Sequence, residues 1–112
     1  EVVIDHSDHF AMPGLIDSHV HLSYGNAKTS EDMDLYASVE FRALRGLYMA
    51  QRVLAAGVTS MIDPGNSGRV TPAIRDAIEA GLFDGPRITT TGPYWSCWSI
   101  ITYVALKNRP QV

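Results

Sequence analysis

The sequence predicts an α/β fold in which short strands alternate with helices along a parallel sheet. Strand-like runs occupy residues 13–22, 58–63 and 87–91, and helical patterns occupy the two intervals between them. Three strands are too few to close an eight-fold βα barrel, which typically takes about 250 residues. The residues alone therefore allow two architectures, a small open sheet or the first part of a barrel.

The composition is that of a globular domain and argues against two kinds of partner. Hydrophobic residues make up 46% and charged residues 19% of the 112 positions, which is ordinary for a globular protein. The net charge of -3 and the lack of a basic run argue against a nucleic-acid partner, and no apolar run is long enough for a membrane span. The first residues lack a signal-peptide pattern, and the single cysteine excludes an internal disulfide, so we expect a cytoplasmic protein. The oligomeric state stays open.

The first twelve residues have the pattern of a β-hairpin. Two apolar runs, Val2–Ile4 and Phe10–Met12, flank the polar segment Asp5–His9, as two strands flank a turn. The histidines and aspartates of this segment could be read as a metal cluster. We interpret them instead as a solvated turn, because polar clusters between apolar runs are usually loops.

The next strand carries the main candidate site. Pro13-Gly14 redirects the chain into a strand that we expect to continue to Leu22. Side chains alternate between the two faces of a strand, so Asp17, His19 and His21 would point the same way. Two neutral imidazoles at this spacing can hold one metal ion. The alternative is a pair of hydrogen-bonded histidines with no ligand.

A helical pattern follows between residues 30 and 56. Thr29 or Ser30 can cap its start, and apolar residues recur at intervals of three and four from Val39 to Leu54. Gly57 stands where a left-handed residue would end the helix. The pattern fits one long helix or a short helix followed by a longer one.

The second half of the chain predicts a strand, a helix and a strand. Residues 58–63 carry some apolar side chains on each face of the predicted strand, as expected for a buried parallel strand. Asp63 ends this strand, either as the first residue of an Asp-Pro-Gly turn, which we favour, or as a group lining a pocket. Thr71 and Pro72 predict the cap and first position of a helix that stops at Gly81. The strand at 87–91 stops at Gly92.

Three blocks of this sequence resemble the amidohydrolase superfamily of metal-dependent hydrolases. Met12–Leu22, which contains the His-X-His pair, resembles the first-strand signature of that superfamily. Leu54–Asp63 is similar to the second-strand block of its imidazolonepropionase-like and prolidase-like branch, and Gly81 with Gly85–Ile88 resembles the start of strand three. A His-X-His pair alone is a weak signal, whereas three blocks in this order are specific.

The resemblance implies a (β/α)8 barrel of the TIM type, of which this chain supplies the first strands and helices. Residues 1–12 would belong to a small β-sandwich domain, and residues 13–92 would form the N-terminal βαβαβ portion of the barrel. Residues 93–112 form a divergent apolar tail, which we interpret as the product of a truncated or frame-shifted reading. The chain is therefore expected to be an N-terminal fragment of a larger hydrolase.

The resemblance also implies hydrolysis of a C–N bond, in a small amide or dipeptide-like substrate, by a metal-activated water. His19 and His21 match the first two metal ligands. The cofactor would be a divalent metal, zinc in the first instance, with one or two ions in the complete enzyme. Asp17, Asp63 and Tyr24 are candidates for supporting a ligand or lining the pocket. The general base and the remaining ligands of the family have no assignable counterpart here, so no catalytic residue is named.

Two other interpretations remain open. The chain could be an inactive, truncated or degenerate piece, or it could come from a deaminase built on the same barrel. Catalytic zinc sites of this kind use three protein ligands and a water, and the chain offers two assignable ligands. We therefore expect the chain by itself to be inactive.

Overall fold

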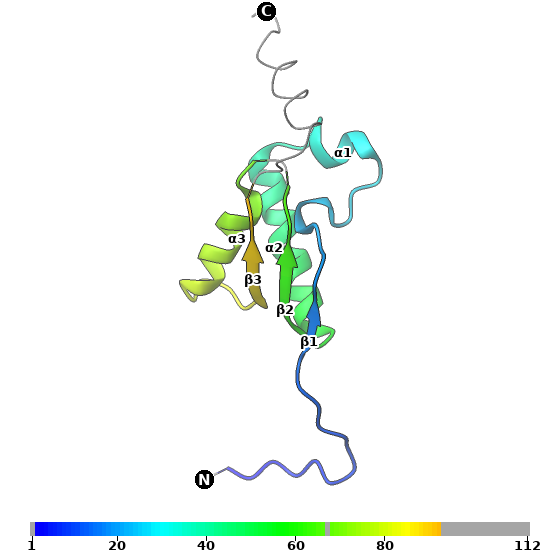
Figure 1. Ribbon diagram of the computed structural model, residues 1–112, viewed down its shortest axis with the longest axis vertical. Coiled ribbons are helices and arrows are strands. Elements are labelled where there is room, and N and C mark those ends of the chain that lie inside the picture. Colours follow the sequence, from blue (N-terminus) through cyan, green and yellow to red (C-terminus); the bar gives the residue numbers. More distant parts are fainter. Residues whose placement is uncertain (1, 67, 93–112) are drawn as a thin grey trace, which may run out of the picture.

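A parallel three-stranded sheet forms the centre of the protein. The computed structural model describes residues 2–66 and 68–92. The strands β1 (Leu15–Asp17), β2 (Val58–Asp63) and β3 (Arg87–Thr90) lie in the order β1-β2-β3, and both pairs are parallel. Figure 1 shows the three strands pointing the same way, so their carboxyl ends meet at one edge of the sheet. The predicted α/β class with a parallel sheet is confirmed.

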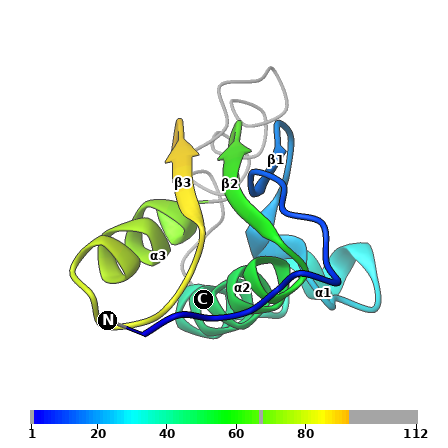
Figure 2. The same cartoon turned by 90° about the horizontal axis from the view of Figure 1, so that it is seen from below.

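The two longer helices cover one face of this sheet. The helix α2 (Val39–Ala55) connects β1 to β2, and α3 (Val70–Glu79) connects β2 to β3. Figure 2 shows both helices on the same side of the three strands. Burial of apolar side chains between these layers is the main stabilising term. Within the described part of the chain, the buried hydrophobic residues are Leu22, Ala50, Met61, Val70, Ile74 and Ile88.

The interval between β1 and β2 holds two helices rather than one. After a single 3-10 turn, η1 (Leu22–Tyr24), the short helix α1 (Ser30–Asp34) precedes α2. Thr29 caps α1 as expected, because its hydroxyl accepts a hydrogen bond from the backbone N–H of Asp32 at 3.1 Å. Gly57 follows the last residues of α2 with φ of +94°, which confirms the predicted left-handed end.

Ser38 caps α2, a role that its sequence context did not reveal. The Ser38 hydroxyl oxygen accepts a hydrogen bond from the backbone N–H of Phe41 at 3.2 Å. The pKa of the Glu40 carboxyl is lowered because the carboxylate accepts hydrogen bonds from its own backbone N–H and from Ser38. The cap therefore satisfies backbone and side-chain groups in the first turn of α2 together.

Substituting Ser38→Ala is expected to lower the free energy of unfolding by about 1 kcal/mol, because it leaves a helix N–H without its acceptor. Ser38→Asp is the matched control, since aspartate also accepts this bond and suits the helix dipole. Urea unfolding followed by circular dichroism compares the variants. Equal midpoints for Ser38→Ala and the unsubstituted chain would contradict the assigned cap.

The strand β1 is shorter than predicted. It ends at Asp17, and the expectation of a regular strand to Leu22 is wrong. The cause is local, because the Asp17 carboxylate accepts the backbone N–H of His19 at 3.1 Å and so bends the chain away from ladder geometry. The chain nonetheless stays beside β2, since the N–H of Val20 donates to the carbonyl of Ile62 at 2.9 Å.

The predicted N-terminal hairpin is also wrong. Residues 2–14 contain no strand, and their one turn is closed by the N–H of His9 donating to the carbonyl of His6 at 2.9 Å. An isolated two-stranded hairpin is marginal in water unless another element packs on it, and the apolar side chains here lie exposed. These side chains are Val2, Val3, Ile4, Phe10 and Met12, with exposed fractions from 69% to 102%. The assignment of residues 1–12 to a β-sandwich domain stays a prediction.

The last segment of the chain, 93–112, lies outside the described residues, and so does the expectation of a divergent apolar tail there. Within residues 2–66 and 68–92, no helix combines the length and the apolar character needed to cross a membrane.

Candidate metal centre

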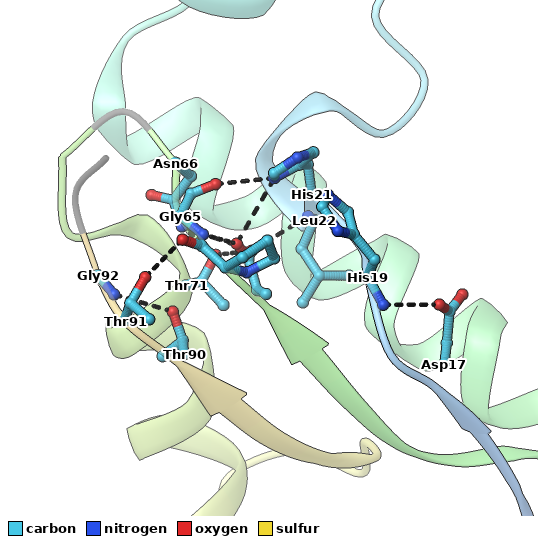
Figure 3. Close-up of polar contacts among 12 residues, drawn as sticks. Asp17, His19, His21, Leu22, Gly65, Asn66, Thr71, Thr90, Thr91 and Gly92 are labelled. Atoms are coloured by element: carbon cyan, nitrogen blue, oxygen red, sulfur yellow. Dashed lines mark hydrogen bonds and ion pairs between the residues drawn. The ribbon is translucent and has the colours of Figure 1, made fainter. Parts of the chain in front are cut away.

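His19 and His21 lie side by side where the chain leaves β1. Their ring centroids are 5.1 Å apart, and the ring planes are perpendicular. Figure 3 shows His21 directed toward Gly65 and Asn66, which follow the carboxyl end of β2. The structure therefore brings the two predicted ligands together at the edge of the sheet where active sites of βα barrels are built.

The ring of His21 is oriented by a main-chain acceptor. Its Nδ1 lies 2.8 Å from the carbonyl oxygen of Gly65. A carbonyl can only accept, so Nδ1 carries the proton, and a neutral ring then has its lone pair on Nε2. Metal-binding histidines usually donate their other ring N–H to a carbonyl or carboxylate in this way.

The spacing of the pair fits shared coordination of one ion. A Zn–N bond of about 2.0–2.1 Å places each ring centroid roughly 3.2 Å from the metal, and a tetrahedral angle then separates two centroids by about 5 Å. The observed separation is 5.1 Å. Within the described part of the chain, no cluster of three or more His, Cys, Asp or Glu side chains is placed to hold a metal ion. The ring spacing of His19 and His21 thus matches that of two ligands of one ion, and a complete site needs others.

A buried carboxylate, Asp63, lies directly behind this pair. Its side chain is fully buried, and its Oδ1 lies 3.8 Å from Nδ1 of His21. The same Oδ1 accepts the backbone N–H of Gly65 at 3.0 Å. Oδ2 accepts the hydroxyl of Thr71 at 2.6 Å and, at the longer distance of 3.4 Å, the backbone N–H of Leu22. Asp63 therefore bonds to Gly65 two residues further along the chain and also supports the region of the histidine pair.

Asp17 and Tyr24, the other two candidate residues, differ in their position relative to the histidine pair. The Asp17 carboxylate bonds to the backbone of His19 rather than to an imidazole ring, and Figure 3 shows it away from His21. The same-face expectation therefore holds for the two histidines and not for Asp17. Tyr24 is half-buried, and its ring lies 5.2 Å from that of His21, so it borders the pair.

Sequence reasoning missed three residues of this region. Gly65 supplies the carbonyl for His21, and Asn66 donates through Nδ2 to Thr71 Oγ1. Thr71 was predicted to cap α3, which is wrong: Arg69 precedes the helix, no side chain caps it, and the Thr71 hydroxyl donates to Asp63. The available signal was the Asp-Pro-Gly-Asn run that begins at the last residue of β2, an apolar strand whose predicted burial on both faces is wrong, since Thr59 and Ile62 are exposed.

Solved structures with similar folds include a dipeptidase and prolidases. One is a Xaa-Pro dipeptidase with methionine bound in its active site, at 32% identity and a TM-score of 0.62, covering 72% of this chain and 20% of the dipeptidase. Another is a putative prolidase from Bifidobacterium longum, at 35% identity and a TM-score of 0.54, covering 73% and 16% of the two chains. A third is a prolidase complexed with N-methylphosphonate-L-proline, at 33% identity and a TM-score of 0.59, covering 72% and 19%.

This chain therefore spans about a fifth of the length of the solved structures that it resembles. No curated protein sequence matches it. The model of the amidohydrolase family matches residues 10–111, a range that includes most of the segment expected to diverge. Because this match covers nearly the whole sequence, the chain belongs to the amidohydrolase family.

Proposed function

We propose that this chain forms the first βα units of a metal-dependent barrel hydrolase that cleaves a C–N bond in dipeptide-like substrates. The observation that carries the proposal is the His19–His21 pair beside the carboxyl end of β2, with Nδ1 of His21 donating to the Gly65 carbonyl. Ring spacing and tautomer both suit a divalent metal, with zinc the first candidate. The described residues supply two of its ligands.

In this reaction the residues of the chain would bind the metal ion and orient its ligands. His19 and His21 would hold the ion, and the Gly65 carbonyl keeps the His21 ring in one tautomer. A bound divalent ion would supply a Lewis acid for the scissile carbonyl and lower the pKa of an attacking water. The general base and further ligands would come from other strands, because active sites of βα barrels collect residues from several strand ends.

The structural relatives support a proposal for the substrate class. Two of them are named as prolidases and one as a Xaa-Pro dipeptidase, and two were solved with methionine or a proline phosphonate. A dipeptide with C-terminal proline is therefore the first substrate to test. Such a small molecule also matches the composition of the chain, which has no basic run for a nucleic acid.

A metal-depletion experiment tests the proposal on the longest polypeptide that contains this chain. We expect hydrolysis of Xaa-Pro dipeptides that is lost on chelation and restored by zinc, with amino-acid release as the measurement. The matched control is a variant carrying His19→Ala and His21→Ala, which zinc should fail to restore. Activity that survives complete removal of metal would contradict the proposal.

The 112-residue chain by itself is expected to show no hydrolysis in the same assay, because two histidines leave a catalytic zinc site incomplete. Adding zinc in excess should not change this result. Turnover by the isolated chain that a chelator abolishes would contradict this expectation, and would mean that residues of this chain complete the site.

A further inference from the structure

The buried carboxylate of Asp63 joins three separate segments around the histidine pair. It accepts hydrogen bonds from Leu22 after β1, from Gly65 in the loop after β2, and from Thr71 in the first turn of α3. Asn66 also donates to Thr71 Oγ1, and its Nδ2 lies 3.5 Å from Asp63 Oδ2. A carboxylate removed from water in this way is retained only where several donors satisfy it. These donors fix the position of both of its oxygens.

Gly65 links this carboxylate to the ring of His21. Its N–H donates to Asp63 Oδ1 at 3.0 Å, and its carbonyl accepts from His21 Nδ1 at 2.8 Å. Its φ of +150° lies in a region that residues with a side chain rarely adopt. The Asp63 carboxylate therefore orients Gly65, and the carbonyl of Gly65 in turn orients the ring of His21.

We infer that Asp63 is a positioning residue for His21, acting through Gly65 to hold the ring in its Nδ1–H tautomer, in which the lone pair lies on Nε2. The consequence for metal affinity rests on the proposed function, whereas the coupling between Asp63 and the ring does not. Asp63 stays 3.8 Å from Nδ1, so the Gly65 carbonyl and not the carboxylate is the direct acceptor. Interactions of this kind typically change metal affinity by about 10- to 100-fold.

The direct test is the tautomer of His21 in the metal-free protein. The chain contains four histidines, so ring nitrogen resonances of a 15N-labelled sample can be assigned by single substitutions. We expect the proton of neutral His21 on Nδ1 alone. His19 is the internal reference, because Gly65 and Asp63 approach the ring of His21 and not that of His19. A proton on Nε2 of His21 would overturn the inference without any variant.

Two variants then separate positioning from simple support of the fold. Asp63→Asn keeps the size of the side chain but replaces one acceptor oxygen with a donor, and Thr71→Val keeps the shape but removes the hydroxyl that holds Oδ2. Thr71→Ser is the matched control because it retains the hydroxyl. In variants that keep the circular dichroism of the unsubstituted chain, we expect both tautomers of His21 and zinc affinity weakened about 10- to 100-fold. Thr71→Ser should retain one tautomer and the original affinity.

The tautomer of His21 and the affinity for zinc together decide the question. If folded Asp63→Asn or Thr71→Val keeps the single Nδ1–H tautomer and unchanged zinc affinity, the inference is wrong. If the tautomer changes in a chain whose histidine resonances do not respond to zinc, the coupling is supported and the proposed metal site is contradicted. If Asp63→Asn does not fold, Thr71→Val and the unsubstituted chain still decide the question.

Discussion

Replacing Asp63 with alanine is expected to cost about 3–5 kcal/mol in the free energy of unfolding. The substitution removes the acceptor for the Thr71 hydroxyl and for the Gly65 N–H, both of which lie in buried surroundings. Each buried donor left unsatisfied costs roughly 1–3 kcal/mol. Small domains have only about 5–15 kcal/mol in total, so the variant should lose a large share of its stability.

Urea unfolding followed by circular dichroism measures this loss. Asp76→Ala is the matched control, because Asp76 is an exposed aspartate of α3 that pairs with the neighbouring Arg75. Exposed ion pairs contribute little, so this control should unfold like the unsubstituted chain. If Asp63→Ala and Asp76→Ala have the same midpoint, Asp63 does not hold the three segments together.

Substituting His21→Ala is expected to lower kcat/KM by at least about a thousandfold in the polypeptide that hydrolyses Xaa-Pro dipeptides. A metal acting as a Lewis acid supplies several kcal/mol of transition-state stabilisation, and each 1.36 kcal/mol corresponds to about tenfold in rate. Zinc content, measured by atomic absorption after dialysis, should fall in parallel. This second readout links the loss of activity to loss of the ion, and an unchanged circular dichroism spectrum shows that the fold is retained.

His9→Ala is the control for that substitution. His9 is also a histidine in contact with an aspartate, since its Nδ1 lies 2.6 Å from Asp8, but it is exposed in the N-terminal turn. The variant should retain both zinc and activity. Equal losses in His9→Ala and His21→Ala would mean that the exposed turn contributes to the metal site as much as the end of β1 does.

The elements that could be predicted from the sequence are those determined by local patterns. The strand β2 was predicted at its observed bounds, because an apolar β-branched run lies between Gly57 and Pro64-Gly65. The pairing of His19 with His21 followed from their spacing and from the family resemblance. Local patterns also located the end of α2, since a glycine tolerates positive φ.

The features that could not be predicted depend on contacts distant in sequence. Gly65 and His21 are 44 residues apart, and Leu22 and Asp63 are 41 residues apart, so no short pattern links them. Thr71 carries a residue type that suits a helix cap, and only the buried carboxylate nearby explains why its hydroxyl bonds elsewhere. The N-terminal hairpin failed for a related reason, because apolar alternation indicates a strand only where a partner surface is present.

The sequential order of the strands has a consequence for synthesis on the ribosome. Each strand pairs with the one before it in the chain, so every new βα unit can dock on a surface that already exists. Within the described residues, the Asp63 carboxylate takes its donors from residues up to Thr71. The backbone of the same loop is held from the end of β3, since the Thr91 N–H donates to the Asp63 carbonyl and the Asn66 N–H donates to the Gly92 carbonyl. The contacts of the carboxylate can therefore form first during synthesis, and β3 then fixes the loop that carries Gly65.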